Sequence, residues 1–226
     1  MEKKTTTILS LLVSLSTSIV SCHNERHEFV DMGLPSGTLW ATCNVGASAP
    51  EEAGDYFAWG ETSAKENYDY TTYKHCNGTY KTITKYNYNS EYGTVDDKDV
   101  LDLEDDAAYV NWGKRWRMPT YNEWKELCDS NYCTLRTINL RGVPGIKVTS
   151  VKNGNTLFFP FAGSRYRTGF WPSEGVGNYW SSTRDPRDHD GNISRCMGFQ
   201  ERVKKGLYGI GNRSDGYSVR PVRRQR

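Results

Sequence analysis

The sequence predicts an α+β protein built from twisted antiparallel sheets, two short helices and long loops. Aromatic residues make up 13% of the 226-residue chain, and 21 residues are Gly, a composition typical of β-rich, loop-rich domains. The pair Asn153-Gly154 lies between two apolar runs, which is a strong signal for a β-hairpin. A third observation, the segment that follows Pro119, predicts a helix that packs on a sheet.

That helix is predicted by a start signal and an apolar face. Pro119 fixes its own φ and favours extended backbone in the residue before it, so a strand should end there. Thr120 is a suitable N-cap, and Glu123 follows three residues later, which together form a capping box. Trp124 and Leu127 lie three residues apart and should face the core.

The first 21 residues have the pattern of a signal peptide, with a basic start and a short apolar run. They end in Ile19-Val20-Ser21-Cys22, which resembles a bacterial lipobox in which Cys22 is lipidated and becomes the mature N-terminus. An ordinary signal peptide followed by a free Cys is the alternative. Residues 22–28 are expected to form a lipidated polar tether, and residues 29–226 a single domain.

Strands are expected wherever short apolar and aromatic runs lie between turn signals. The apolar run over residues 156–161 indicates a buried, central strand, and Pro160 suggests a bulge or a strand end. The predicted strands cover residues 39–40, 55–59, 145–150, 156–161, 179–180, 197–199 and 216–222.

Two segments before the helix at 120 have unusual compositions. Residues 66–92 carry many Tyr side chains among polar ones and should form an exposed excursion, either a Tyr-rich binding loop or a decoration that covers the core edge. Residues 96–106 are acidic. A calcium site is conceivable, but the spacing does not match an EF-hand. A helix from Asp102 to Gly113, with acids at its positive end, is favoured.

Several motifs, in a fixed order, resemble a known family. They are Asp31-Met-Gly-Leu-Pro-Ser-Gly-Thr-Leu-Trp-Ala-Thr-Cys-Asn-Val-Gly46, Gly54-Asp-Tyr-Phe-Ala-Trp-Gly-Glu-Thr62, Trp116-Arg-Met-Pro-Thr120 with Glu123-Trp124, Gly145-Ile-Lys-Val-Thr-Ser150, Tyr179-Trp-Ser-Ser-Thr183 and Gly216-Tyr-Ser-Val-Arg-Pro-Val222. The chain after about residue 29 resembles the Fibrobacter succinogenes major paralogous domain. This resemblance implies the C-type-lectin-like fold of the formylglycine-generating-enzyme superfamily, with the last strand returning beside the first.

The cysteines bear on both stability and chemistry. Five follow Cys22, and Cys128 with Cys133 is the preferred disulfide pair in an envelope protein. The enzymes of the superfamily use two reactive cysteines in the C-terminal part, where this chain has only Cys196. We therefore expect no catalytic residue, no cofactor and no metal site. The Asp188-His189-Asp190 run lacks a nucleophile elbow and is better interpreted as a solvated turn.

The resemblance places ligand-contacting positions in the interval 184–213, sometimes diversified by retroelements. This interval is rich in charged, Asn and Gly residues, so we expect display loops that contribute little to the core. The expected ligand-binding residues are Tyr179, Trp180, Arg184, Arg187, Asp188, His189, Asn192, Tyr208, Asn212 and Arg213. Trp171, Tyr179 and Trp180 are the candidate ring platforms for a sugar.

These observations predict a non-catalytic lipoprotein of the outer membrane or cell surface that binds a glycan or a surface protein. The alternatives are an enzyme of the formylglycine-generating type and a structural or fimbrial-tip component. A net charge of +2 argues against nucleic acid as a partner. Contact with the membrane is expected through the lipid anchor only. The terminal residues Arg220, Arg223, Arg224 and Arg226 are expected to form a solvated tail.

Overall fold

The computed structural model describes residues 27–171 and 175–225, with no side-chain description for 203–205. The strands are β1 (Phe29–Asp31), β2 (Thr38–Ala41), β3 (Tyr56–Phe57), β4 (Cys133–Leu140), β5 (Val143–Ser150), β6 (Thr156–Pro160), β7 (Ser164–Tyr166), β8 (Gly169–Trp171), β9 (Val176–Arg184), β10 (Ile193–Gln200), β11 (Val203–Asn212), β12 (Tyr217–Ser218) and β13 (Val222–Arg224). The helices are α1 (Ala107–Trp112) and α2 (Tyr121–Leu127), with 3-10 turns η1 (Tyr80–Thr82), η2 (Ser90–Tyr92) and η3 (Leu103–Asp105).

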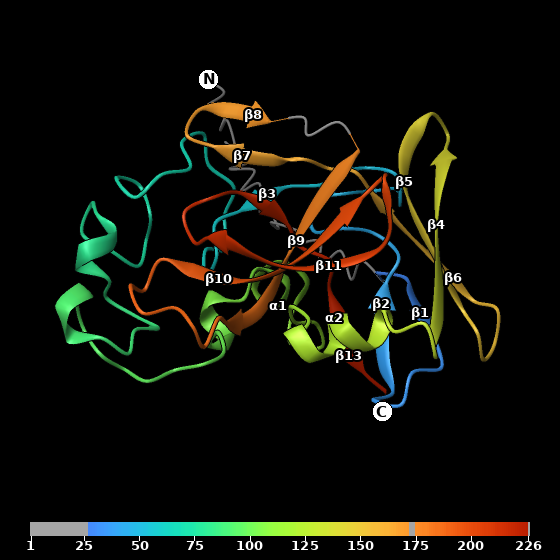
Figure 1. Cartoon of the computed structure of the whole chain (residues 1–226), viewed down its shortest axis with the longest axis horizontal. Helices are drawn as coiled ribbons and strands as arrows, with labels where there is room; N and C mark the ends of the chain where they lie inside the picture. The colour runs from blue at the N-terminus through green and yellow to red at the C-terminus, as the bar shows by residue number, and fades with distance from the viewer. Residues whose placement is uncertain (1–26, 172–174, 226) are drawn as a thin grey trace, which may run out of the picture.

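The sheets are mainly antiparallel, as the sequence predicts (Figure 1). A five-stranded sheet has the order β11-β10-β9-β12-β3, and two three-stranded sheets have the orders β1-β2-β13 and β4-β5-β6. Strands β7 and β8 form a separate hairpin. Among the named strands, β12 and β9 are the one parallel pair in the described chain. The α+β class is therefore confirmed.

Helix α2 begins at the predicted capping box. The Thr120 hydroxyl accepts from the Glu123 N–H at 3.3 Å, and the Glu123 carboxylate accepts from the Thr120 N–H at 2.8 Å. Trp124 and Leu127 are fully buried, and the Trp124 ring centroid lies 4.7 Å from that of Trp40 on β2. The predicted stop, cap and apolar face thus fix this helix against the core.

Helix α1 is shorter than the sequence predicts. It begins at Ala107, where the Asp106 carboxylate accepts from the N–H groups of the second and third helical residues, and it ends at Gly113 with φ +87°. The expected start at Asp102 is wrong. Asp102 lies before η3 and pairs with the ammonium groups of Lys85 and Lys98, each at 2.6 Å. Asp102 therefore pairs with two lysines outside the helix instead of capping it.

The hairpin at Asn153-Gly154 is confirmed, since β5 and β6 pair in antiparallel register on either side of it. The apolar residues Leu157 to Phe159 are buried. However, β6 is an edge strand and β5 is the central one, so the predicted central position is wrong. Pro160 ends β6, as expected from its missing N–H.

The excursion over residues 66–92 covers the edge of the core instead of standing free. Tyr68 and Tyr73 are buried in a small cluster with Cys76 and Ile83, and Tyr86 is fully buried in a second cluster. The hydroxyls of Tyr68 and Tyr73 donate to backbone carbonyls in and beside β3, to that of Tyr56 at 2.6 Å and to that of Trp59 at 2.7 Å.

The interval 184–213 contains the strand pair β10–β11, so the expectation of packing-poor loops is wrong. β10 lies inside the five-stranded sheet, with Met197 and Phe199 buried on one face and Cys196 on the other. The glycines of β11 weaken the strand signal in the sequence. They have a packing role, because a Cβ at Gly211 would lie 2.8 Å from the Trp180 ring.

The last strand closes the domain. β13 pairs with β2, which contains the first predicted strand, while β1 occupies the other edge of that sheet. Arg220 is fully buried and donates to the Asn44 side chain at 2.7 Å and the Phe158 carbonyl at 3.0 Å. Burial lowers the pKa of Arg220 to about 10. The expected solvated tail is therefore wrong for this arginine, and Arg226 lies outside the described residues.

Among the described residues, none of the helices has the length and apolar character needed to cross a bilayer. The predicted signal peptide and Cys22 lie outside the described residues. The expected disulfide is not formed, since Cys128 and Cys133 are both free thiols. The Cys128 sulfur instead lies 3.9 Å from the sulfur of Met197.

Candidate functional site

Half of the residues expected to bind ligand are buried and carry structural contacts. Tyr179 and Trp180 are fully inaccessible to solvent, on opposite faces of β9. The Tyr179 hydroxyl donates to the Pro160 carbonyl at 2.6 Å, and the Trp180 indole donates to the Phe57 carbonyl at 2.7 Å. The expectation that these rings form a sugar platform is wrong, because their faces pack in the core.

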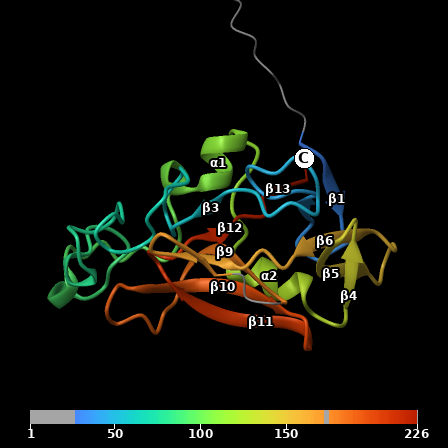
Figure 2. The same cartoon turned by 90° about the horizontal axis from the view of Figure 1, so that it is seen from above.

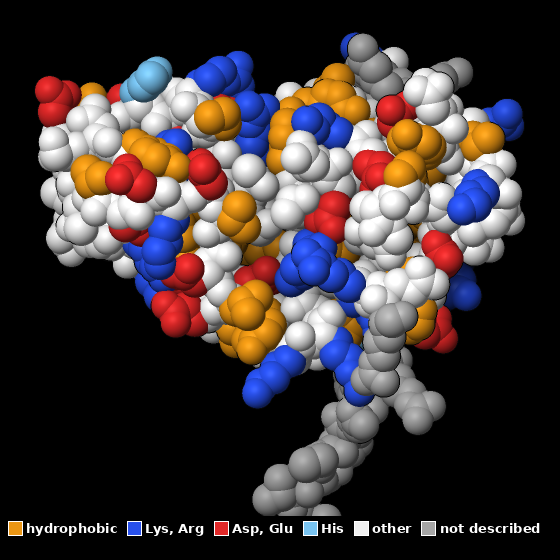
Figure 3. Space-filling model, turned by 90° about the horizontal axis from the view of Figure 1, so that it is seen from below, with side chains coloured by type: hydrophobic (Ala, Val, Ile, Leu, Met, Phe, Trp, Pro, Cys, Tyr) orange, Lys and Arg blue, Asp and Glu red, His pale blue; other side chains and the backbone are white. Residues whose placement is uncertain are grey.

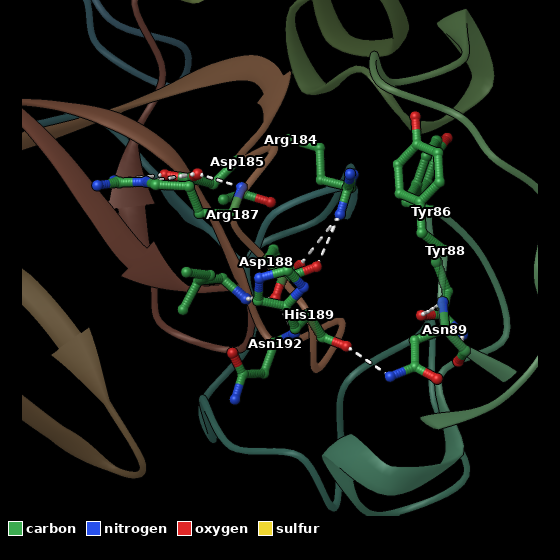
Figure 4. Close-up of polar contacts among 12 residues, drawn as sticks. Tyr86, Tyr88, Asn89, Arg184, Asp185, Arg187, Asp188, His189 and Asn192 are labelled. Atoms are coloured by element: carbon green, nitrogen blue, oxygen red, sulfur yellow. Dashed lines mark hydrogen bonds and ion pairs between the residues drawn. The ribbon is translucent and has the colours of Figure 1, made fainter. Parts of the chain in front are cut away.

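Arg184, Asp188 and Arg213 form a buried ionic cluster, of which Figure 4 shows Arg184 and Asp188. Arg213 donates to the Asp188 carboxylate at 2.6 Å, and Arg184 donates to the Asp188 carbonyl at 3.0 Å. The Arg184 guanidinium also lies 3.7 Å from the ring centroid of Tyr88 in the excursion. Burial lowers the pKa of Arg213 below its usual range. These three predicted ligand contacts therefore join the excursion to β9 and β11.

The other expected residues lie toward the surface, in two places. Arg187 and Tyr208 lie beside the start of α2. Arg187 pairs with Asp185 at 3.0 Å, and the Tyr208 ring centroid is 5.9 Å from that of Tyr121. Arg195 joins this group, with its guanidinium 4.4 Å from the Tyr121 ring. We call Tyr121, Arg187, Arg195 and Tyr208 the Tyr–Arg surface.

His189, Asn192 and Asn212 lie near the excursion. His189 is exposed, and its carbonyl accepts from the Asn89 side chain at 3.2 Å (Figure 4). Asn192 and Asn212 line a hollow of about 570 Å³ together with side chains from two other parts of the chain. The residues that line this polar–aromatic hollow are Asp69, Tyr70, Thr71, Tyr80, Tyr166, Arg167, Asn192, Asn212 and Ser214.

The fold brings the walls of the hollow together by specific hydrogen bonds. Tyr68 and Arg167 exchange two backbone hydrogen bonds of 2.9 Å, which tie the excursion to the turn between β7 and β8. Arg167 has φ +53°, in the left-handed region that the tight turn requires. The Tyr70 hydroxyl donates to the Asn192 carbonyl at 2.9 Å, which ties the excursion to the start of β10.

The hollow combines ring faces with neutral polar groups and with two charged ones, the carboxylate of Asp69 and the guanidinium of Arg167. Tyr70 contacts Tyr80 edge-to-face at 6.0 Å between centroids, and Tyr166 is 42% exposed at the rim. Burial raises the pKa of Tyr70 well above its usual value, so its hydroxyl keeps the proton that it donates to the Asn192 carbonyl, and its oxygen can accept from a ligand. Asn amides supply both donors and acceptors, and Arg167 supplies planar donors. Such a mixture suits a hydroxyl-rich ligand better than an apolar one.

Sequence reasoning missed much of the hollow. Tyr166, Arg167 and Ser214 carry no motif, and only the tertiary fold places them beside Asn192 and Asn212. Tyr70 and Tyr80 belong to the Tyr-rich excursion, for which the sequence predicts either a binding loop or a decoration of the core edge.

The carboxylates of the acidic segment bind a lysine side chain of the same chain. Asp102, Glu104 and Asp105 form the one group of acids with metal-like spacing among the described residues. The Lys85 ammonium lies 2.6 Å, 3.0 Å and 2.6 Å from their carboxylates. Asp105 is also bound by Lys74 at 2.7 Å and by the Tyr86 hydroxyl at 2.7 Å. Lysine thus occupies the place that a bound cation would need.

Comparison of the chain with protein-family models, curated proteins and solved structures found no match.

Proposed function

We propose that this chain is a non-catalytic, lipid-anchored protein of the outer membrane or cell surface that binds a glycan in the polar–aromatic hollow. The proposal includes similarity to the Fibrobacter succinogenes major paralogous domain and its C-type-lectin-like fold. The observation that carries it is the convergence of Tyr rings, amides and a guanidinium from three distant segments on one hollow. Sugars present both apolar ring faces and hydroxyl groups, and this lining can contact both.

The state of Cys196 favours binding over formylglycine-type chemistry. Its side chain is 3% exposed within a core cluster, and burial raises the pKa of the thiol to about 12. A reactive cysteine needs an accessible thiolate, which burial in apolar surroundings disfavours.

A glycan array probed with the full chain tests the proposal, followed by titration of any glycan found. A ring that packs on a sugar contributes about 1–2 kcal/mol, so Tyr166→Ala should weaken binding roughly 5- to 30-fold. Asn212→Ala should weaken it in the same direction by removing amide hydrogen bonds. Tyr132→Ala is a matched control, because Tyr132 is also a partly exposed tyrosine, 37% against 42%, but does not line the hollow.

The Tyr–Arg surface favours a protein ligand as the second candidate. Exposed Tyr and Arg side chains are enriched at protein interfaces, and here they form one group of packed rings and guanidinium groups. Pull-down of surface proteins with the full chain and with Tyr208→Ala separates the two candidates. A partner that is lost with Tyr208→Ala and kept with Tyr166→Ala would contradict the glycan proposal. Co-purification with a surface polymer would instead favour the structural or fimbrial-tip role.

A further inference from the structure

A basic face surrounds the point where the described chain begins. A hollow of about 520 Å³ is lined by Leu103, Tyr109, Lys114, Arg115, Trp116, Arg117, Arg223, Arg224 and Gln225. Arg117 is neutralised by Glu123 at 2.5 Å. Within the described part of the chain, no acid forms a salt bridge with Lys114, Arg115, Arg223 or Arg224. Four cationic side chains on this face therefore have no acidic partner among the described residues.

One of these cations is fixed in place. The Arg223 guanidinium lies 4.5 Å from the ring centroid of Phe29 and 5.7 Å from that of Trp116. Its Nε atom is buried and has no hydrogen-bond partner among the described residues. A guanidinium packed against two rings loses less side-chain entropy on binding an anion than a free arginine would.

Exposed apolar side chains accompany the cations. Phe29 is 46% exposed and Leu103 is 52% exposed. Leu103 lines the basic hollow itself, and Phe29 contacts Arg223. Figure 3 shows basic side chains beside hydrophobic ones on the face seen from below, where Figure 1 places the C-terminus. Cations mixed with exposed apolar groups are typical of surfaces that rest on a lipid head-group layer.

The start of the domain lies at this face. The His27 ring stacks on Trp112 at 3.6 Å between centroids and meets Trp116 edge-on at 6.1 Å. In Figure 2 the C-terminus lies beside β1. Cys22 precedes His27 by five residues, which span at most roughly 18 Å when fully extended. A lipid on Cys22 would therefore hold this face, and not another, close to the bilayer.

We propose that this basic face binds the anionic phospholipid surface of the membrane that carries the anchor. Lys114, Arg115, Arg223 and Arg224 contact lipid phosphates, while the exposed apolar side chains enter the head-group layer. The orientation rests on the lipid anchor of the proposed function, but the affinity for anionic lipid does not. Membrane contact then extends beyond the anchor. In Figure 1 the β7–β8 hairpin, which contributes Tyr166 and Arg167 to the polar–aromatic hollow, lies on the side of the molecule opposite the C-terminus, so docking at the basic face leaves this hairpin away from the membrane.

Lysine footprinting on vesicles tests this docking. The full lipidated chain is inserted into vesicles of phosphatidylcholine alone or of phosphatidylcholine with phosphatidylglycerol, and acylation of each lysine is followed by mass spectrometry. Lys114 should be modified several-fold more slowly on the anionic vesicles, and 0.5 M NaCl should abolish the difference. Lys81, exposed on the excursion, is the control within the same molecule. Equal modification of Lys114 on both vesicles would overturn the proposal.

Charge-reversal variants separate the face from the anchor. The triple variant Lys114→Glu, Arg115→Glu and Arg224→Glu should lose the preference for anionic vesicles, since each cation contributes about five-fold at such a surface. The matched variant Lys81→Glu, Arg136→Glu and Arg202→Glu changes the net charge equally at exposed positions elsewhere, and should keep the preference. If both variants lost the preference for anionic vesicles equally, net charge alone would explain it, and the proposal of a specific basic face would be refuted. Sedimentation with phosphatidylcholine alone reports the anchor independently.

Discussion

Asp188 is a predicted ligand contact that the structure places in the interior, so its replacement tests the reassignment directly. The Arg213 side chain is 0% exposed and its Nη2 lies 2.6 Å from the Asp188 carboxylate. Arg184, with a side chain 5% exposed, lies 3.9 Å from the same carboxylate. Asp188→Ala would leave both guanidinium groups buried without their counter-charge. Removing one partner of a buried ion pair costs about 3–5 kcal/mol of folding free energy.

Thermal unfolding measures this cost. For a domain of this size, about 1 kcal/mol shifts Tm by roughly 2–4 °C, so Asp188→Ala should lower Tm by roughly 6–20 °C. Arg187→Ala is the matched control, because Arg187 pairs with Asp185 in the same loop but has a side chain that is 68% exposed. Asp185 is buried but keeps the Arg195 guanidinium at 3.1 Å, so removing the exposed Arg187 should cost only about 0–1 kcal/mol. A Tm loss for Asp188→Ala no larger than that for Arg187→Ala would refute the buried-cluster interpretation.

Four further predictions follow from the structure and the sequence. Thr120→Ala removes the helix cap and should cost about 1 kcal/mol in urea unfolding; an unchanged midpoint would contradict this. Burial opposes ionisation of Glu123, yet the Arg117 guanidinium and hydrogen bonds hold its pKa at about 2, below the ordinary 4.5. The folded-state pKa is depressed, so this stabilisation is complete above pH 4.5 and is lost as the pH falls toward 2. Urea midpoints across that range should fall less for Glu123→Gln than for the wild type. Gly211→Ala would place a Cβ within 2.8 Å of packed rings and should cost about 1–3 kcal/mol, measured by melting. Cys22→Ser should move the protein from membranes to the soluble fraction, and unchanged partitioning would exclude lipidation at Cys22.

Local signals in the sequence were sufficient for the parts of the fold that depend on neighbours in the chain. The capping box at Thr120 and Glu123 needs only residues three apart, and it forms as predicted. The hairpin at Asn153-Gly154 depends on the left-handed backbone that Gly154 adopts, with φ +74°. These predictions hold because no distant contact competes with the local preference.

The candidate site depends on distant contacts, and the same reasoning failed there. Arg184, Asp188 and Arg213 have the residue types of an exposed binding loop. Their burial follows from a mutual charge balance across 29 residues of sequence and from the Tyr88 ring. A polar residue carries no local signal of whether water or another part of the chain will satisfy it. The same limit applies to Arg220, which appears in a basic tail but is enclosed by backbone carbonyls.

The burial of these residues also shapes the polar–aromatic hollow. Its walls come from the excursion, the β7–β8 turn and the ends of β10 and β11, and contacts within the protein join them: the paired backbone bonds of Tyr68 and Arg167, the Tyr70 bond to Asn192 and the Arg184–Tyr88 stack. All of these contacts join residues of the protein itself. Walls joined in this way lose little conformational entropy when a ligand binds, so little of the interaction free energy is spent on ordering them. The ionic cluster that sequence reasoning assigned to ligand contact thus serves the hollow indirectly, by holding its excursion wall against the sheet.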